Sequence, residues 1–174
     1  AIVFAALIYV QLCEKKRALS KAKNTIYLIR YIFTISITLT GLIFCVVLAP
    51  GADNANYNAW SMASVMTHVI VPTLSITDLF VDDYRIALKR RHVFYTAIPP
   101  LLYLIFSSIL GLSGVDFGRG DNFPYFFLNF NSPAGLFGTS DVMPYRIGSF
   151  YWIVFMLGIS LGFGALYKKL YKRW

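Results

Sequence analysis

The chain has 174 residues, of which 57% are hydrophobic, 17% aromatic and only 14% charged. A soluble domain of this length carries more charge, so the composition excludes an ordinary soluble protein and indicates an integral membrane protein. The formal net charge of +8 does not indicate nucleic-acid binding, because the Lys and Arg residues lie in short clusters between apolar segments.

Five apolar segments follow one another along the chain, and each is expected to be a transmembrane helix. The first ends at a charged run and is shorter than the roughly 30 Å hydrocarbon core, which predicts that the chain begins partway through a helix. The expected fold is an all-α transmembrane helix bundle in one membrane domain, residues 1–174, with six helices in the intact protein. The five segments are 1–13, 26–50, 60–81, 93–112 and 148–168.

The basic residues predict the orientation of the bundle. Residues 15–30 contain six Lys and Arg, residues 85–91 four and residues 168–173 four. The connection 50–59 has none, and the connection 113–146 has two against three aspartates. By the positive-inside rule the first group is cytoplasmic, together with the C-terminus, and the second is external.

Three local patterns refine this expectation. Pro99 and Pro100 predict a bent or broken fourth helix, and the Gly158–Gly162 spacing predicts a face that allows close helix approach. The external loop 113–146 contains the aromatic segment 123–130, which is expected to lie in the membrane interface or to fold back over the bundle as a lid.

The apolar run 60–81 carries two ionisable side chains, His68 and Asp78. Such residues are costly inside a membrane and commonly mark a working site. His68 is therefore the candidate general base, and the alternative is a neutral imidazole that only bonds to a neighbouring helix. Asp78 lies at the depth of Arg30, so these two are expected to form a structural ion pair. About 15 Å of helix rise separates them from His68.

Acyl transfer needs a hydroxyl near the histidine. Thr38, Thr40 and Thr67 lie at similar depth, although Thr67 is expected to point about 100° away from His68 because it is the adjacent residue on a helix. No HExxH, Cys/His cluster, phosphate-binding glycine loop or GxSxG motif is present, so no metal and no cofactor is predicted.

Several segments in order resemble the bacterial six-helix relatives of the androgen-induced protein family. They are ITLTGLI at 37–43, HVIVP at 68–72 followed by Asp78, PLLY at 100–103 and FPY at 123–125. The resemblance implies a bundle in the bacterial plasma membrane. It also implies a threonine hydrolase acting within the membrane on fatty acid esters of hydroxy fatty acids. His68 then corresponds to the essential histidine, and the threonine nucleophile falls upstream of Ala1.

The leading hypothesis is a lipid-ester hydrolase or acyl-transfer enzyme that takes membrane lipids or another amphiphilic small molecule as substrate. The alternative is a non-enzymatic membrane subunit or a small-molecule binding or transport protein. The predicted substrate-binding residues are Thr38, Thr40, Thr67, Tyr103 and Tyr125.

Overall fold

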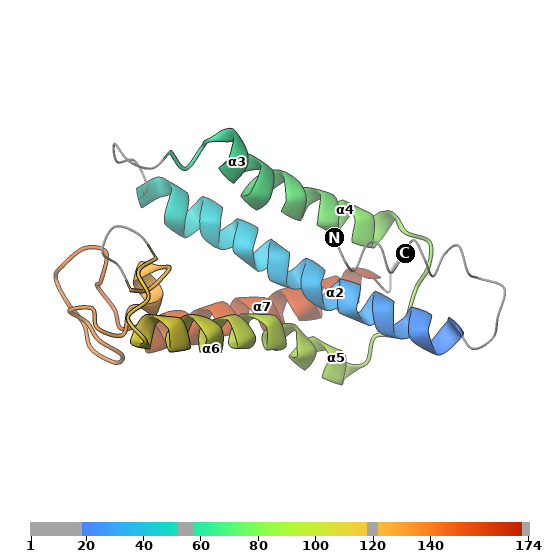
Figure 1. The fold of residues 1–174 in the computed structure, drawn as a ribbon. Helices are drawn as coiled ribbons and strands as arrows, with labels where there is room; N and C mark the ends of the chain where they lie inside the picture. Colours follow the sequence, from blue (N-terminus) through green and yellow to red (C-terminus); the bar gives the residue numbers. More distant parts are fainter. Residues whose placement is uncertain (1–18, 52–57, 118–121, 172–174) are drawn as a thin grey trace. The chain divides into compact units, whose positions relative to one another are not determined.

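The computed structural model describes residues 19–51, 58–117 and 122–171, and this part of the chain is helical (Figure 1). It contains no β-strand, and the isolated bridge between Thr139 and Ile147 is the one β-type pairing in it. The α-helices are α2 (Leu19–Ile43), α3 (Met62–Val65), α4 (Val71–Val81), α5 (Arg90–Phe94), α6 (Ile98–Leu112) and α7 (Ser149–Tyr171). Two π-helical turns, Phe44–Leu48 and Met66–Ile70, continue α2 and join α3 to α4.

Four helical stretches in the described part are long and apolar enough to cross a membrane, as expected of an integral membrane protein. They agree with the second to fifth predicted spans to within a few residues. The predicted first span, 1–13, lies outside the described residues, so five spans are not observed. The four stretches are Ala22–Leu48, Met62–Val81, Arg90–Leu112 and Ser149–Tyr171.

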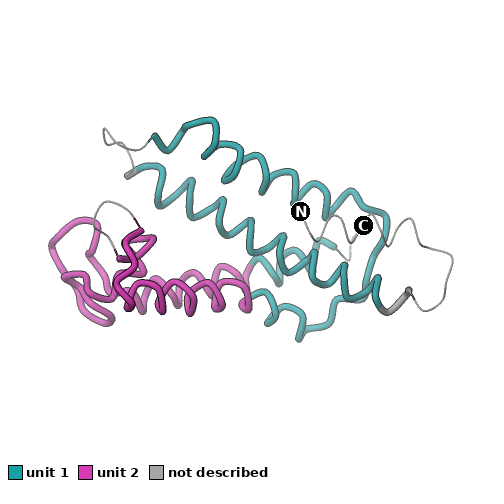
Figure 2. Tube along the Cα trace, in the orientation of Figure 1, with its two compact units in different colours: residues 1–96, 163–174 teal, residues 97–162 magenta. Residues whose placement is uncertain are grey.

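The chain forms two compact units, coloured separately in Figure 2. Unit 1 comprises residues 1–96 and 163–174, and unit 2 comprises residues 97–162. In unit 1, α2 lies along α4 and bonds to the last turns of α7, where the Tyr31 hydroxyl donates to the Gly164 carbonyl (2.6 Å). The core of this unit is built on the side chains of Tyr31, Ile35, Leu79, Leu88, Tyr167 and Tyr171.

Both π turns precede a proline, and the chemistry of proline explains them. Proline has no N–H, so it cannot bond to the carbonyl four residues earlier. Before Pro50, the Ala49 N–H bonds to the Phe44 carbonyl, and before Pro72 the Val71 N–H bonds to the Met66 carbonyl, five residues back in each case. Such widened turns occur frequently at functional sites.

The fourth predicted span is interrupted, as its two prolines predicted. A 3₁₀ turn, Tyr95–Ala97, separates α5 from α6, and Pro99 and Pro100 lie in the first turn of α6. A helix does not need N–H donors in its first turn, so two consecutive prolines are tolerated there.

The predicted external loop is folded against helices of unit 2. Phe123, Phe127 and Leu128 are buried, the latter two in a short 3₁₀ turn. Phe127 packs against Trp152 of α7, and the ring of Phe123 approaches Gly111 of α6 so closely that a Cβ there would lie 2.5 Å from it. The aromatic segment is therefore a packed part of this unit.

The prediction of close helix approach at Gly158 and Gly162 is wrong within the described residues. A Cβ added at either glycine would meet no heavy atom within 4 Å. The close approaches lie elsewhere, at Gly41 in α2 and at Gly164, where a Cβ would come within 3.2 Å of Val93 and 3.0 Å of Thr96. Glycine spacing alone does not show which side of a helix meets a neighbour.

Candidate functional site

His68 lies in the π turn between α3 and α4, and its side chain is half-buried. Its Nδ1 is 3.0 Å from the carbonyl oxygen of Ser64, one turn earlier. A carbonyl can only accept a hydrogen bond, so this contact assigns a proton to Nδ1, and in the neutral ring the lone pair then lies on Nε2. Within the described residues Nε2 makes no hydrogen bond. The neutral ring is thus held in the tautomer whose lone pair lies on Nε2.

Thr67 contacts His68 directly, and the prediction that it points away was wrong. Thr67 Oγ1 lies 2.9 Å from His68 Nδ1. Both side chains reach back to the preceding turn, since the Thr67 hydroxyl donates to the Ala63 carbonyl (2.8 Å) and also lies 3.3 Å from the Ser64 carbonyl oxygen. Because both side chains approach the Ser64 carbonyl, the Thr67 hydroxyl and the His68 ring lie next to each other. The hydroxyl therefore lies beside Nδ1, on the side of the ring away from the free lone pair.

Phe44, at the start of the other π turn, covers one face of the imidazole. The two rings are stacked with centroids 4.3 Å apart and an interplanar angle of 13°. Phe44 is itself buried, and Trp60 meets it edge-on at 6.1 Å. Sequence reasoning did not identify this residue, because nothing in the pattern distinguishes it from the other phenylalanines of the chain.

Gly41 holds the backbone of the histidine turn against α2. A Cβ at this position would lie 2.8 Å from the His68 carbonyl oxygen and 3.1 Å from Pro72 Cγ. This carbonyl would bond to the N–H of residue 72 in a regular α-helix, and proline has none. Only glycine permits α2 to pack this closely on it.

Thr38 and Thr40 do not approach the imidazole by any hydrogen bond in the described structure. The buried Thr38 hydroxyl donates to the Thr34 carbonyl (2.7 Å) and lies 3.2 Å from the Tyr167 hydroxyl. The exposed Thr40 hydroxyl donates to the Ser36 carbonyl at 3.1 Å. Such bonds to the carbonyl one turn earlier are usual for threonine within helices.

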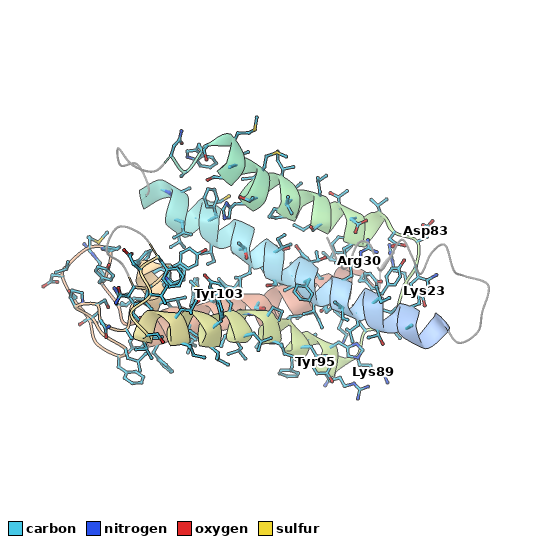
Figure 3. All side chains as sticks on the ribbon, viewed as in Figure 1. Lys23, Arg30, Asp83, Lys89, Tyr95 and Tyr103 are labelled. Atoms are coloured by element: carbon cyan, nitrogen blue, oxygen red, sulfur yellow. The ribbon has the colours of Figure 1, made fainter. Side chains whose placement is uncertain are left out.

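Tyr103 and Tyr125 come together in unit 2, on α6 (Figure 3) and in the aromatic segment. Their ring centroids are 6.3 Å apart, and Tyr125 also stacks on Phe127 at 5.0 Å. Tyr103 is 44% exposed. The predicted site residues therefore fall into two groups, these two tyrosines in unit 2 and the threonines with His68 in unit 1.

The ion pair between Arg30 and Asp78 is present, with 2.6 Å between Arg30 Nη2 and Asp78 Oδ2. Asp82, which sequence reasoning missed, binds the same guanidinium through Nη1. The Arg30 side chain is 5% exposed, against 42% for Asp78 and 17% for Asp82. From the sequence alone, an aspartate directly after the end of a helix is expected to be exposed to solvent. The extended backbone of Asp82 instead turns it toward the arginine.

Further contacts stabilise this charged cluster, and Figure 3 shows Lys23, Arg30 and Asp83 at the same end of unit 1. Asp82 Oδ1 accepts a hydrogen bond from the Tyr84 backbone N–H at 2.9 Å. Burial acts to raise the pKa of the Asp82 carboxyl. Bonds from the Tyr84 N–H and from the Arg30 and Tyr27 side chains, with the Arg30 charge, outweigh burial and hold that pKa below the ordinary value of an aspartate.

Comparison of the chain with known proteins gives no family assignment, since no family model, no curated protein and no solved structure matches it. Within the described residues, no three His, Cys, Asp or Glu side chains gather as metal donors. The candidate site is therefore defined by its geometry, an imidazole of one π turn stacked on a phenylalanine of the other, on helices of membrane-spanning length.

Proposed function

We propose that the protein is an integral membrane lipid-ester hydrolase or acyl-transfer enzyme in which His68 is the general base. The observation that carries the proposal is the hydrogen bond from His68 Nδ1 to the Ser64 carbonyl, which leaves Nε2 as a free proton acceptor. The resemblance to the androgen-induced protein family, with its six-helix fold and threonine nucleophile, supports the same chemistry.

In this mechanism Nε2 accepts the proton of an attacking hydroxyl as its oxygen bonds to the ester carbonyl carbon. The imidazolium then returns the proton to the departing alkoxide, and the ester C–O bond breaks. The Ser64 carbonyl stabilises the protonated ring by accepting the Nδ1 hydrogen bond throughout. None of Thr38, Thr40 and Thr67 is assigned as nucleophile, because their hydroxyls are bonded to helix carbonyls.

An amphiphilic ester is the substrate class that suits this position. His68 lies on a helical stretch of membrane-spanning length, Met62–Val81, whose neighbouring side chains include the exposed Met62, Met66 and Leu74. Long acyl chains partition into such surroundings at roughly 0.8 kcal/mol per methylene group. In the orientation that the basic residues predict, this histidine lies in the outer half of the bilayer and the C-terminus is cytoplasmic.

The direct test is turnover of long-chain acyl esters by purified protein in detergent micelles. His68→Gln removes the base, and we expect a loss of about 10²- to 10⁴-fold in kcat/KM. His92→Gln is the matched control, because it replaces the other histidine of the chain, which lies in α5 and outside the turn that carries His68. Unchanged turnover in His68→Gln, with a melting temperature equal to that of the wild type, would overturn the proposal.

A fluorophosphonate probe reports the nucleophile separately. We expect covalent labelling of one hydroxyl in the wild type and its loss in His68→Gln, and mass spectrometry of the labelled peptide identifies the residue. Labelling that persists in the variant contradicts activation by this histidine.

A non-enzymatic binding or transport role is the second candidate. It is favoured by the stacking of Phe44 on the imidazole and by the bonding of all three threonine hydroxyls to their own helices. This role predicts stable binding of an unreacted amphiphile or co-purification with a stoichiometric partner subunit. Release of free fatty acid from a bound ester excludes it.

A further inference from the structure

Two segments of unit 1 place five basic side chains near one another. Lys89 precedes α5, and Arg90 and Arg91 begin it. The remaining two lie in the last turn of α7. All but Lys168, which is half-buried, are exposed. We call these residues the basic cluster: Lys89, Arg90, Arg91, Lys168 and Lys169.

Close packing joins the two segments. Gly164 of α7 lies against Val93 of α5, where an added Cβ would come within 3.2 Å of the valine side chain. Lys89 and Lys168 each lie four residues, about one turn, from this contact. The charges of Lys89, Arg91 and Lys168 all act on the ring of His92, so the lysine of α7 lies near the same ring as the other two.

The turn that presents the cluster is ordered. His92 is buried, and its Nδ1 accepts a hydrogen bond from the Lys89 backbone N–H at 3.2 Å. The ring also stacks on Tyr95 with 5.8 Å between centroids. Lys89 and Tyr95 are labelled in Figure 3, and they lie directly before and directly after α5. The basic side chains at the start of α5 are thus carried by a turn that hydrogen bonding and ring stacking hold in place.

Nothing in the described part of the chain neutralises these charges. The ion pairs of Arg30 with Asp78 and Asp82 do not involve the basic cluster, and no member of the cluster forms an ion pair within residues 19–51, 58–117 and 122–171. Apolar side chains lie next to the cations in sequence, Phe94 at 67% exposure and Leu166 at 46%. A ligand that fits therefore carries negative charge and an apolar tail.

We propose that the basic cluster binds the phosphate-bearing headgroup of an anionic lipid, with an acyl chain along Phe94 and Leu166. Basic residues at the ends of neighbouring membrane helices attract anionic headgroups, each contributing about a fivefold increase in affinity. The phosphate oxygens accept hydrogen bonds from the guanidinium and ammonium groups. This site does not depend on the chemistry of His68.

The test uses the full chain in neutral detergent micelles, titrated with phosphatidylglycerol, with phosphatidylcholine or with inorganic phosphate. Lipid adducts are counted by native mass spectrometry. We expect saturable binding of phosphatidylglycerol, and a roughly 25-fold weaker affinity in Arg90→Gln/Arg91→Gln and in Lys168→Gln/Lys169→Gln. Arg90→Lys/Arg91→Lys is the matched control, because it keeps both charges and is expected to retain most of the affinity.

Two outcomes overturn the proposal. Equal binding of phosphatidylglycerol by the wild type and both glutamine variants removes the cluster from the site. Binding of phosphatidylcholine or inorganic phosphate as tight as that of phosphatidylglycerol removes the anionic lipid as its ligand. Each variant is compared with the wild type only after their melting temperatures are shown to agree, and the lysine variant separates loss of charge from loss of fold.

Discussion

The imidazole of His68 and the ring of Phe44 lie face to face, 4.3 Å apart, and each belongs to a π turn that precedes a proline. The two irregular turns therefore meet at the candidate site. One presents the histidine with its proton fixed on Nδ1, and the other covers a face of the ring. The irregularity of the backbone and the position of the imidazole have the same cause, the missing N–H of Pro50 and Pro72.

Replacing Phe44 with Leu keeps most of the apolar volume and removes the stacked face. We expect a loss of about 0.5 to 1.5 kcal/mol in the free energy of unfolding. We also expect faster carbethoxylation of His68 by diethyl pyrocarbonate, because one face of the ring becomes accessible. Mass spectrometry measures the rate, with His92 as internal reference. Phe33→Leu on the exposed side of α2 is the control, and an unchanged rate at His68 in Phe44→Leu contradicts the stacking.

Gly41→Ala tests the close approach of α2 to the histidine turn. The new methyl group would lie 2.8 Å from the His68 carbonyl oxygen, so the backbone must shift. We expect a loss of about 1 to 3 kcal/mol in the free energy of unfolding, measured by denaturant titration in mixed micelles. Gly158→Ala, which meets no atom within 4 Å, should gain up to about 1 kcal/mol. Equal stability of the two variants would show that the helices do not meet at Gly41.

The sequence was sufficient to predict the helical fold because membrane-spanning helices follow from length and hydropathy. Four predicted spans match helical stretches of the described residues, and the prolines of the fourth span coincide with its interruption. The helix rise of 1.5 Å per residue also placed Arg30 at the depth of Asp78. These predictions need only distances along a helix.

Predictions that depend on direction around a helix were less successful. The angle between Thr67 and His68 was wrong because both side chains reach back to one carbonyl in a widened turn. The glycine face at Gly158 meets no neighbour in the part of the chain that the structure describes, because spacing does not identify the neighbouring helix. Phe44 and Asp82 were missed because their roles arise from contacts between segments distant in the sequence. Phe44 joins the two π turns, and Asp82 joins the end of α4 to α2.

Arg30→Gln removes the cation shared by two carboxylates, and we expect it to lower the free energy of unfolding by about 3 to 5 kcal/mol. Asp82→Asn should cost less, because Asp78 still faces the guanidinium. Asp78→Asn should cost least, since its side chain is 42% exposed and water screens the pair. Thermal unfolding in detergent ranks the three variants.

Arg146→Gln, at an exposed position of the loop, is the control for loss of one positive charge. If Arg30→Gln lowers the free energy of unfolding no more than this control does, the prediction is contradicted.

The lowered pKa of Asp82 predicts a pH dependence of stability. A carboxyl whose pKa is lower in the folded than in the unfolded state binds fewer protons when folded. Its stabilisation is complete above the unfolded pKa, about 3.9, and is lost as pH falls through the folded value. We expect the melting temperature to fall below about pH 4, and to fall less in Asp82→Asn than in the wild type. Asp141→Asn in the exposed loop should leave the profile unchanged, and identical profiles for all three proteins contradict a role for Asp82.

The aromatic segment of unit 2 is expected to resist proteolysis because its phenylalanines are packed on helices. Phe127 is 4% exposed, stacks on Tyr125 at 5.0 Å and lies 5.9 Å from Trp152. Phe127→Ala removes these contacts, at a cost of roughly 3 to 5 kcal/mol for a buried phenylalanine, so the open form of the segment becomes more populated. Cleavage by chymotrypsin within residues 113–148 should then accelerate at least about tenfold, since proteolysis follows the population of the open form.

Phe137→Ala, which removes a ring that is 60% exposed, is the matched control. Equal cleavage rates in the two variants would mean that the segment is open in the wild type, and that Tyr125 is not held beside Tyr103.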